Sequence, residues 1–291
     1  MEATILTEVL LPLALATIML GMGLSLTPTD FSQLWRQPKP VLLGLVGQLI
    51  ILPCIALALI GVFNLSSTLA IGLMIIAACP GGSTSNIISH VARANMALSV
   101  SLTALSTTIC IVTTPLIIST ALIWFGESTE SFSILGTTLG LLGITLIPIM
   151  IGMFVKAKAN NFAVKSEKFF RAFSVSFLAL MILLIVIQEW DQIAQHYGTL
   201  VPSAFALTLL ASFSGFALGK ATKEPHRNAL TLGIEVGIQN ATLAIFIAIT
   251  FLDRPDLATA AGMYGLVMYV GALLLITFAK LRNREMNPAA N

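Results

Sequence analysis

Charged residues are scarce in this chain of 291 residues, of which only 10% are Asp, Glu, Lys or Arg. Soluble globular domains carry about 25% of such residues, so the composition excludes an ordinary water-soluble globule. Apolar residues make up 57% of the sequence, and the mean hydropathy is +0.95. The apolar runs are much longer than the roughly 10 residues of a membrane β-strand, which predicts an all-α polytopic membrane protein.

Cysteine and histidine are also scarce, with three residues of each. Cys54, Cys79 and Cys110 fall inside predicted membrane spans, where we expect them to pack as small apolar side chains. Their spacing fits no disulfide framework and no metal site. An intramembrane enzyme would need a nucleophile with its base, or a metal cluster, and the sequence places neither at membrane depth. We therefore expect no enzyme activity, and we expect no soluble domain that would suit a sensor.

Nine apolar spans are predicted, each long enough to cross a bilayer as a helix. They cover residues 8–27, 40–62, 67–89, 97–125, 133–155, 169–188, 198–219, 229–252 and 257–279. The first is expected to remain as a span and not to be a cleaved signal peptide, because Glu2 and Glu8 lead it and no basic residue does.

Basic residues segregate to one side of this arrangement. Fourteen of the fifteen Lys and Arg residues fall on the side of the C-terminus, and only Arg254 falls on the other. The positive-inside rule therefore predicts a cytoplasmic C-terminus and an external N-terminus, in what we expect to be a bacterial inner membrane. Because the basic residues follow topology, they do not indicate nucleic-acid binding. Those between Lys156 and Arg171 are expected to meet lipid headgroups or water.

The third span is interrupted by Pro80, Gly81 and Gly82, which tolerate an unwound backbone. A new half-helix is expected to begin there, and its free N–H groups would suit an anionic substrate. The first residues of that half-helix all carry side-chain oxygens: Ser83, Thr84, Ser85 and Asn86. The alternative is a proline kink whose polar neighbours only satisfy the broken backbone.

The eighth span is interrupted by Glu235, Gly237, Gln239 and Asn240. Glu235 is the one acidic residue that we place outside the loops and tails. A carboxylate in hydrocarbon usually belongs to an ion path or a binding site, although it can also be a structural group satisfied by its neighbours. Five crossings separate the two interrupted spans, so they run in opposite directions. This predicts an inverted repeat of spans 1–4 and 6–9, with the transport site between the interruptions.

Other oxygen-bearing side chains lie in nearby spans. Ser99 and Thr103 are four residues apart and share a helix face, and Gln48 is the one amide in its apolar run. Oxygen ligands without Cys or His suit an alkali cation better than a transition metal. Hydroxyl groups in membrane helices can also be packing devices. Proton coupling, with Glu235 taking up and releasing a proton, stays open as an alternative.

The segment from Ala78 to Asn86, followed by the segment from Ala97 to Thr103, closely resembles the bile acid:sodium symporter family. Residues 235–240 resemble the family's second crossover motif, and the early residues 21–24 and 30–31 also match. The resemblance extends over most of the chain. It implies a core of spans within residues 40–125 and 198–280, with two crossing broken helices, and a panel of spans within 8–27 and 133–188.

The resemblance also implies the ligands of two sodium ions, with Na⁺ as the coupling ion and no other cofactor. The first ion would be bound by Ser85, Asn86, Ser99, Thr103 and Glu235. The second would be bound by Gln48, Glu235, Gln239 and the backbone carbonyls of Val236 and Ile238. An organic anion would contact Ser83, Thr84 and Asn240, and no obligatory protein partner is expected.

One departure concerns the last span, which in the family often carries a Trp-His-Asn signature. The comparable region here reads Val267-Met268-Tyr269-Val270-Gly271. We therefore expect sodium-coupled uptake of either a bile-acid-like anion or a smaller carboxylate such as pantoate, by alternating access. Proton-coupled transport or export on the same fold is the alternative, and an intramembrane enzyme is a remote one.

Overall fold

The computed structural model describes residues 6–127 and 132–286, and all regular secondary structure in them is helical. In these residues, seven continuous helices are long and apolar enough to cross a membrane, which confirms the prediction of a polytopic all-α membrane protein. They are built from α1 (Leu11–Ser25, after the π-helical η1, Leu6–Leu10), α4 with η2 and α5 (Pro38–Val46, Gly47–Ile51, Leu52–Phe63), α8 (Met96–Trp124), α9 with η3 and α10 (Ile134–Leu141, Leu142–Leu146, Ile147–Lys158), α11 (Asn160–Gln188), α12 (Trp190–Ala221), and η5 with α15 (Pro255–Leu257, Ala258–Met286).

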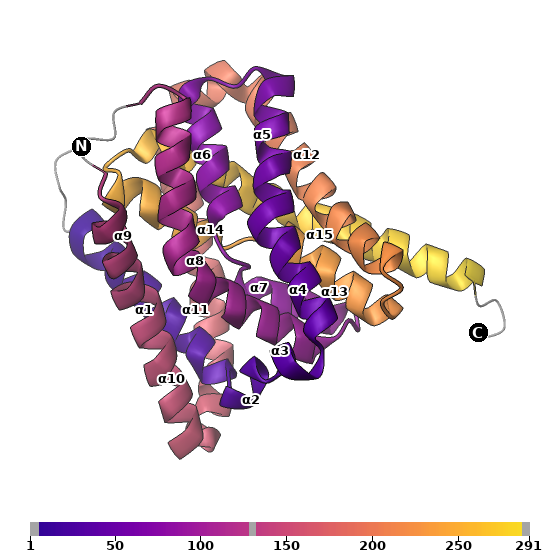
Figure 1. Cartoon of the computed structure of the whole chain (residues 1–291). Helices are drawn as coiled ribbons and strands as arrows, with labels where there is room; N and C mark the ends of the chain where they lie inside the picture. The colour runs from indigo at the N-terminus through magenta and orange to yellow at the C-terminus, as the bar shows by residue number, and fades with distance from the viewer. Residues whose placement is uncertain (1–5, 128–131, 287–291) are drawn as a thin grey trace.

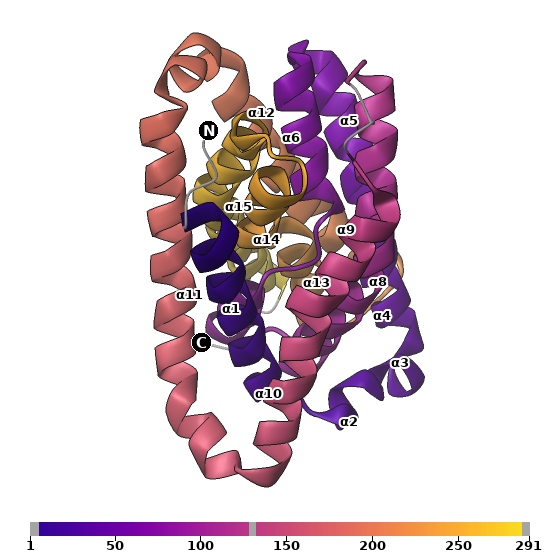
Figure 2. The same cartoon turned by 90° about the vertical axis from the view of Figure 1, so that its left-hand side faces the viewer.

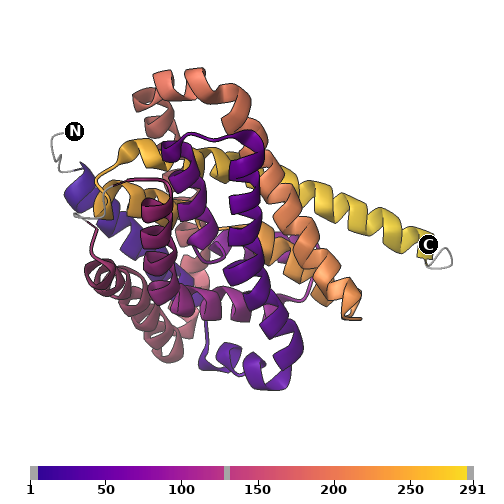
Figure 3. The same ribbon diagram turned by 45° about the horizontal axis from the view of Figure 1, so that its top comes forward.

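The other two predicted spans are each divided into two shorter helices. The third span consists of α6 (Ser67–Ala78) and α7 (Ser83–Val91), and the eighth consists of α13 (His226–Gly237) and α14 (Ala241–Phe246), which continues as η4 (Ile247–Phe251). Figure 1 shows the two breaks near the middle of the molecule. Two short helices, α2 (Pro28–Phe31) and α3 (Gln33–Arg36), precede α4. Figures 1 and 3 show the C-terminal part of α15 extending away from the other helices.

The two broken helices cross at their breaks, where the extended segments pair like antiparallel strands. Gly81 and Gln239 form an isolated antiparallel bridge. The Gly82 N–H donates to the Ile238 carbonyl at 3.1 Å, and the Asn240 N–H donates to the Pro80 carbonyl at 2.9 Å. Backbone groups freed by a helix break must be satisfied inside the protein at membrane depth. Each break therefore supplies hydrogen-bond partners for backbone groups that the other break leaves free.

Glycine is required at this crossing because the two backbones are in close contact. A Cβ atom on Gly82 would lie 2.9 Å from the carbonyl oxygen of Gln239. A Cβ atom on Gly81 would lie 2.9 Å from Gln48 Nε2 and 3.0 Å from Glu235 Oε2. The Pro-Gly-Gly sequence thus interrupts the helix and also lets the second broken helix approach.

Three helices form one side of the molecule. Figure 2 shows α11 along that side with α1 and α10 beside it, and α1 packs against both α10 and α11. On the other side, α12 packs against α13 and α15, while α8 packs against α6. Helix α1 also contacts α14, so it lies at the seam between the two groups. The core and panel division implied by the resemblance stays a prediction.

One sequence expectation is wrong. The segment between the predicted spans 133–155 and 169–188 was expected to be a loop, yet α11 begins at Asn160, so Glu167 lies on a helix that continues through Arg171. Glu235 is consequently not the one acidic residue outside loops and tails, since Glu167 and Asp191 are also helical. Hydropathy marks only the part of a helix that lies in lipid, whereas Lys, Arg and Glu are good helix formers and continue the helix beyond it.

Candidate functional site

The carboxylate of Glu235 is wholly buried and is surrounded by hydroxyl groups. Its Oε1 atom accepts hydrogen bonds from Ser85 Oγ at 2.6 Å and from Ser99 Oγ at 2.5 Å. Its Oε2 atom accepts from Thr103 Oγ1 at 3.0 Å. None of the ion pairs found in the described residues involves Glu235. A buried charge needs a counter-charge, because neutral donors offset only part of the desolvation energy.

Ser99 faces more acceptors than it has protons. Its Oγ atom lies 2.5 Å from Glu235 Oε1, 2.8 Å from Asn86 Oδ1 and 3.1 Å from Ser89 Oγ. A hydroxyl group donates only one hydrogen bond, so it cannot serve both Asn86 and Glu235. The excess of oxygen acceptors around one point is the arrangement that a cation would satisfy.

Two amide side chains converge on the backbone carbonyl of Glu235 from another direction. Gln48, in the π-helical turn η2, donates from Nε2 at 2.8 Å, and Gln239 Nε2 lies at 3.5 Å from the same oxygen. The Oε1 atoms of both glutamines are buried and have no hydrogen-bond partner in the described residues. An unsatisfied buried acceptor costs about 1–3 kcal/mol, so these two oxygens are further candidate cation ligands.

The two backbone carbonyls expected as ligands already accept hydrogen bonds. The Val236 carbonyl accepts from Gln239 Nε2 at 2.9 Å, and the Ile238 carbonyl accepts from the Gly82 N–H at 3.1 Å. A carbonyl oxygen has two lone pairs, so each retains the capacity for one more partner.

The break in α13 also has partners that the sequence did not indicate. The helix supplies no backbone donor for the carbonyl of Gly237. This carbonyl instead accepts hydrogen bonds from Tyr264 Oη at 2.8 Å and from Thr208 Oγ1 at 3.3 Å. Ser89, on the turn after Ser85, was likewise not predicted. No local pattern marks these residues, because their roles depend on how α12, α15 and α8 pack against the crossing.

The residues expected to contact substrate lie at a small hollow over the crossing. Ser83 and Thr84 are half-buried and line it together with Gln239 and Asn240. Asn240 also caps α14, since its Oδ1 atom accepts from the Leu243 N–H at 3.0 Å. The structure thus brings Ser83, Thr84 and Asn240 to one place.

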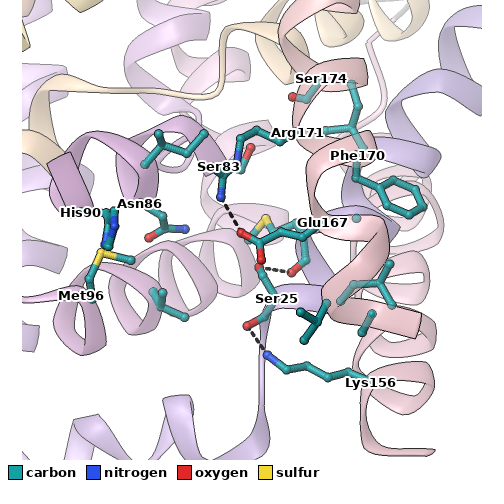
Figure 4. Close-up of a pocket in the computed structure, with 18 residues that line it drawn as sticks. Ser25, Ser83, Asn86, His90, Met96, Lys156, Glu167, Phe170, Arg171 and Ser174 are labelled. Carbon is teal, nitrogen blue, oxygen red and sulfur yellow. Dashed lines mark hydrogen bonds and ion pairs between the residues drawn. The ribbon is translucent and has the colours of Figure 1, made fainter. Parts of the chain in front are cut away.

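A cavity of about 400 Å³ adjoins this hollow, between α1, α7 and α11 (Figure 4). Ile18, Ser83 and Ser174 line both spaces. The cavity extends from the crossing to the end of the molecule where α10 meets α11. Its polar lining consists of Ser25, Ser83, Asn86, His90, Lys156, Glu167, Arg171 and Ser174. Its apolar lining includes Met22, Ile87, Val100 and Phe170.

Comparison with known sequences identifies the family. The model of the sodium bile acid symporter family matches residues 12–196. The chain belongs to this family. The resemblance expected from the sequence motifs is therefore confirmed, and the protein is an integral membrane protein of a sodium-dependent transporter family.

Three similar proteins come from a bacterium and from two plants. An uncharacterised sodium-dependent transporter of Bacillus subtilis is 32% identical over 239 residues, which are 80% of this chain and 72% of the relative. Two chloroplast proteins, each described as a probable sodium/metabolite cotransporter, are both 28% identical. The Oryza sativa protein is matched over 96% of this chain and 65% of its own length, and the Arabidopsis thaliana protein over 83% and 59%. The chain thus spans about three fifths of these two plant relatives.

Proposed function

We propose that the protein is a secondary active transporter that couples the uptake of an organic anion to sodium ions. The observation that carries this proposal is the buried Glu235 carboxylate, which has hydroxyl donors but no ionic partner in the described residues. The oxygens around it come from both broken helices, from α8 and from η2. Oxygen ligands of this kind suit Na⁺.

Two ions would share Glu235. The first would be bound on the side of α7 and α8, where the hydroxyl and amide oxygens exceed the available protons. The second would be bound where the Oε1 atoms of Gln48 and Gln239 lack partners, with Val236 and Ile238 offering their second lone pairs. Two sodium ions and a monovalent anion carry one net positive charge, so a membrane potential of 100 mV contributes about 2.3 kcal/mol to inward transport.

The anion would bind over the crossing, next to Ser83, Thr84 and Asn240. The N-terminus of α7 presents free N–H groups there, which favour negative charge. The Gly82 N–H donates to the carbonyl of Ile238, a proposed ion ligand, and Ser83, a proposed substrate residue, directly follows Gly82 in the chain. Ion binding at Glu235 would therefore set the geometry of the anion site, which supplies a physical basis for coupling.

We infer that this structure represents the inward-facing state of an alternating-access cycle. The cavity is lined by Lys156, on the side that the positive-inside rule places in the cytoplasm together with the C-terminus. The helices on its two sides would be the panel, with α1, α10 and α11, and the core, with both broken helices. The membrane is proposed to be a bacterial inner membrane. A cavity of about 400 Å³ lies within the usual range for small-molecule sites, so we keep both a small carboxylate such as pantoate and a bile-acid-like anion as candidate substrates.

Transport in proteoliposomes tests the proposal. Uptake of labelled pantoate or cholate should require external Na⁺ and should stop when choline or K⁺ replaces it. The Glu235→Gln variant should lose the sodium stimulation. Uptake by the wild type that follows a pH gradient and ignores Na⁺ would instead support proton coupling. The absence of any sodium-dependent flux with either probe would contradict the proposal.

A further inference from the structure

Helix α11 projects two charged side chains into the cavity, one turn apart. Figure 4 shows Glu167 and Arg171 extending from α11 toward the side on which Ser83 and Asn86 lie. The two form an ion pair, and their side chains are 51% and 48% exposed. Both charges therefore remain accessible to solvent and solutes in the cavity, even though the helix continues into the membrane.

This ion pair contributes little to holding the helices together. Both partners lie on α11 at positions i and i+4, so the pair joins no second element. An exposed pair of this kind stabilises a helix by about 0.3–0.5 kcal/mol. The cavity wall also carries the basic side chains of His90 and Lys156. Lys156 has a structural partner, because its Nζ atom donates to the Ser25 carbonyl at 2.7 Å. Arg171 has only its neighbour on the same helix as an ionic partner in the described residues.

The position of Arg171 suits recognition of a carboxylate. The guanidinium group binds carboxylates through two parallel hydrogen bonds, which gives both charge and orientation. Across the cavity lie Ser83 and the start of α7, where free N–H groups also favour an anion. Without a ligand, the carboxylate of Glu167 binds the guanidinium group of Arg171, at the place where the carboxylate of a ligand would bind.

We propose that Arg171 is a specificity-determining residue that binds the carboxylate of the transported anion, in competition with Glu167. This rests on the proposed function and adds the residue that selects for negative charge. The arriving carboxylate takes the place of Glu167 on Arg171 and reaches the Ser83 side of the cavity. Because α11 and α7 lie on opposite walls, a bound anion links the two sides that alternating access must move.

Binding of two probes to the purified protein in saturating Na⁺ tests this inference. The probes are pantoate and cholate, a small and a large carboxylate, and the readout is the probe concentration that gives half of the maximal thermal shift. Arg171→Gln should weaken binding of the responding probe at least 10-fold, and Arg171→Lys should restore only part of it. Glu167→Gln should bind more tightly than the wild type, because the competitor is gone. A purely structural ion pair would instead give the same loss in both variants.

Lys168→Gln is the matched control, since Lys168 is an exposed cation on α11 that does not line the cavity. It should bind the probe like the wild type, which separates a local contact from a general loss of positive charge. Equal binding by Arg171→Gln and the wild type overturns the inference, and so does a wild type that responds to neither probe. The thermal shift produced by Na⁺ alone should persist in every variant. If Na⁺ produces no shift in the wild type, it is the proposed sodium coupling that fails.

Discussion

Ser85 and Glu235 are 150 positions apart in the chain, yet Ser85 Oγ donates a 2.6 Å hydrogen bond to the Glu235 carboxylate. This contact joins α7, which follows the first break, to α13, which precedes the second. It explains why two interruptions in apolar runs act as one unit. The broken backbones hold each other through hydrogen bonds, and the side chains that follow them meet around a single buried charge.

Gly82 should not tolerate a side chain. In Gly82→Ala, the new Cβ atom would lie 2.9 Å from the Gln239 carbonyl oxygen, which belongs to backbone and cannot move independently. We expect loss of transport and a clear fall in thermal stability. Gly61→Ala is the matched control, because its Cβ atom would meet nothing within 4 Å in α5. That change should keep full activity and stabilise the helix by up to about 1 kcal/mol.

Gln48 should determine the binding of the second ion. Gln48→Leu removes the amide that donates to the Glu235 carbonyl and the Oε1 atom that has no partner in the described residues. If two ions bind, the sodium dependence of uptake should have a Hill coefficient above one in the wild type and near one in the variant. An unchanged coefficient and an unchanged half-saturating Na⁺ concentration would contradict the assignment of this residue. Gln188→Leu, at the exposed end of α11, is the control.

Tyr264 should stabilise the break in α13. Its hydroxyl group is buried and donates at 2.8 Å to the Gly237 carbonyl, which otherwise has only the longer bond from Thr208. Tyr264→Phe should lower the free energy of unfolding by about 1–3 kcal/mol, because a buried acceptor loses its main donor. Tyr197→Phe, on an exposed side chain of α12, should change it little. Denaturation of both variants in detergent would measure the difference.

The side of the protein opposite the cavity should carry a pH-sensitive contribution to stability. Partial burial, and then the nearby Asp256, raise the pKa of Glu189, which lies between α11 and α12. A raised carboxyl pKa favours the neutral form in the folded protein, so the stability it contributes is present at low pH. It is lost as the pH rises above the ordinary value of 4.5 and through the raised pKa. Glu189→Gln should therefore be more stable than the wild type above that range and equal to it below. Asp191→Asn, at an exposed neighbouring position, is the control for the loss of one negative charge.

The sequence predicted the elements whose signal is local. Pro80, Gly81 and Gly82 indicated the break in the third span, and Glu235 stood out because a carboxylate is costly in an apolar run. Glu167 was assigned to a loop because hydropathy falls where a helix leaves the lipid, although its four-residue spacing from Arg171 is itself a helical signal. The roles of Tyr264 and Ser89 could not be predicted, because they depend on the packing of helices distant in the chain. The sodium ligands and the core and panel division stay predictions.

Equilibrium binding of radioactive Na⁺ to the purified protein tests whether Glu235 holds the coupling ions. We expect saturable binding that K⁺ does not displace, and we expect this binding to be lost in Glu235→Gln. Glu167→Gln is the control, because it makes the same chemical change on the cavity wall. It should retain Na⁺ binding, which would show that a folded protein with one carboxylate fewer still binds the ion. Wild-type binding that does not saturate, or Glu235→Gln binding equal to that of the wild type, would contradict the claim that Glu235 holds the coupling ions.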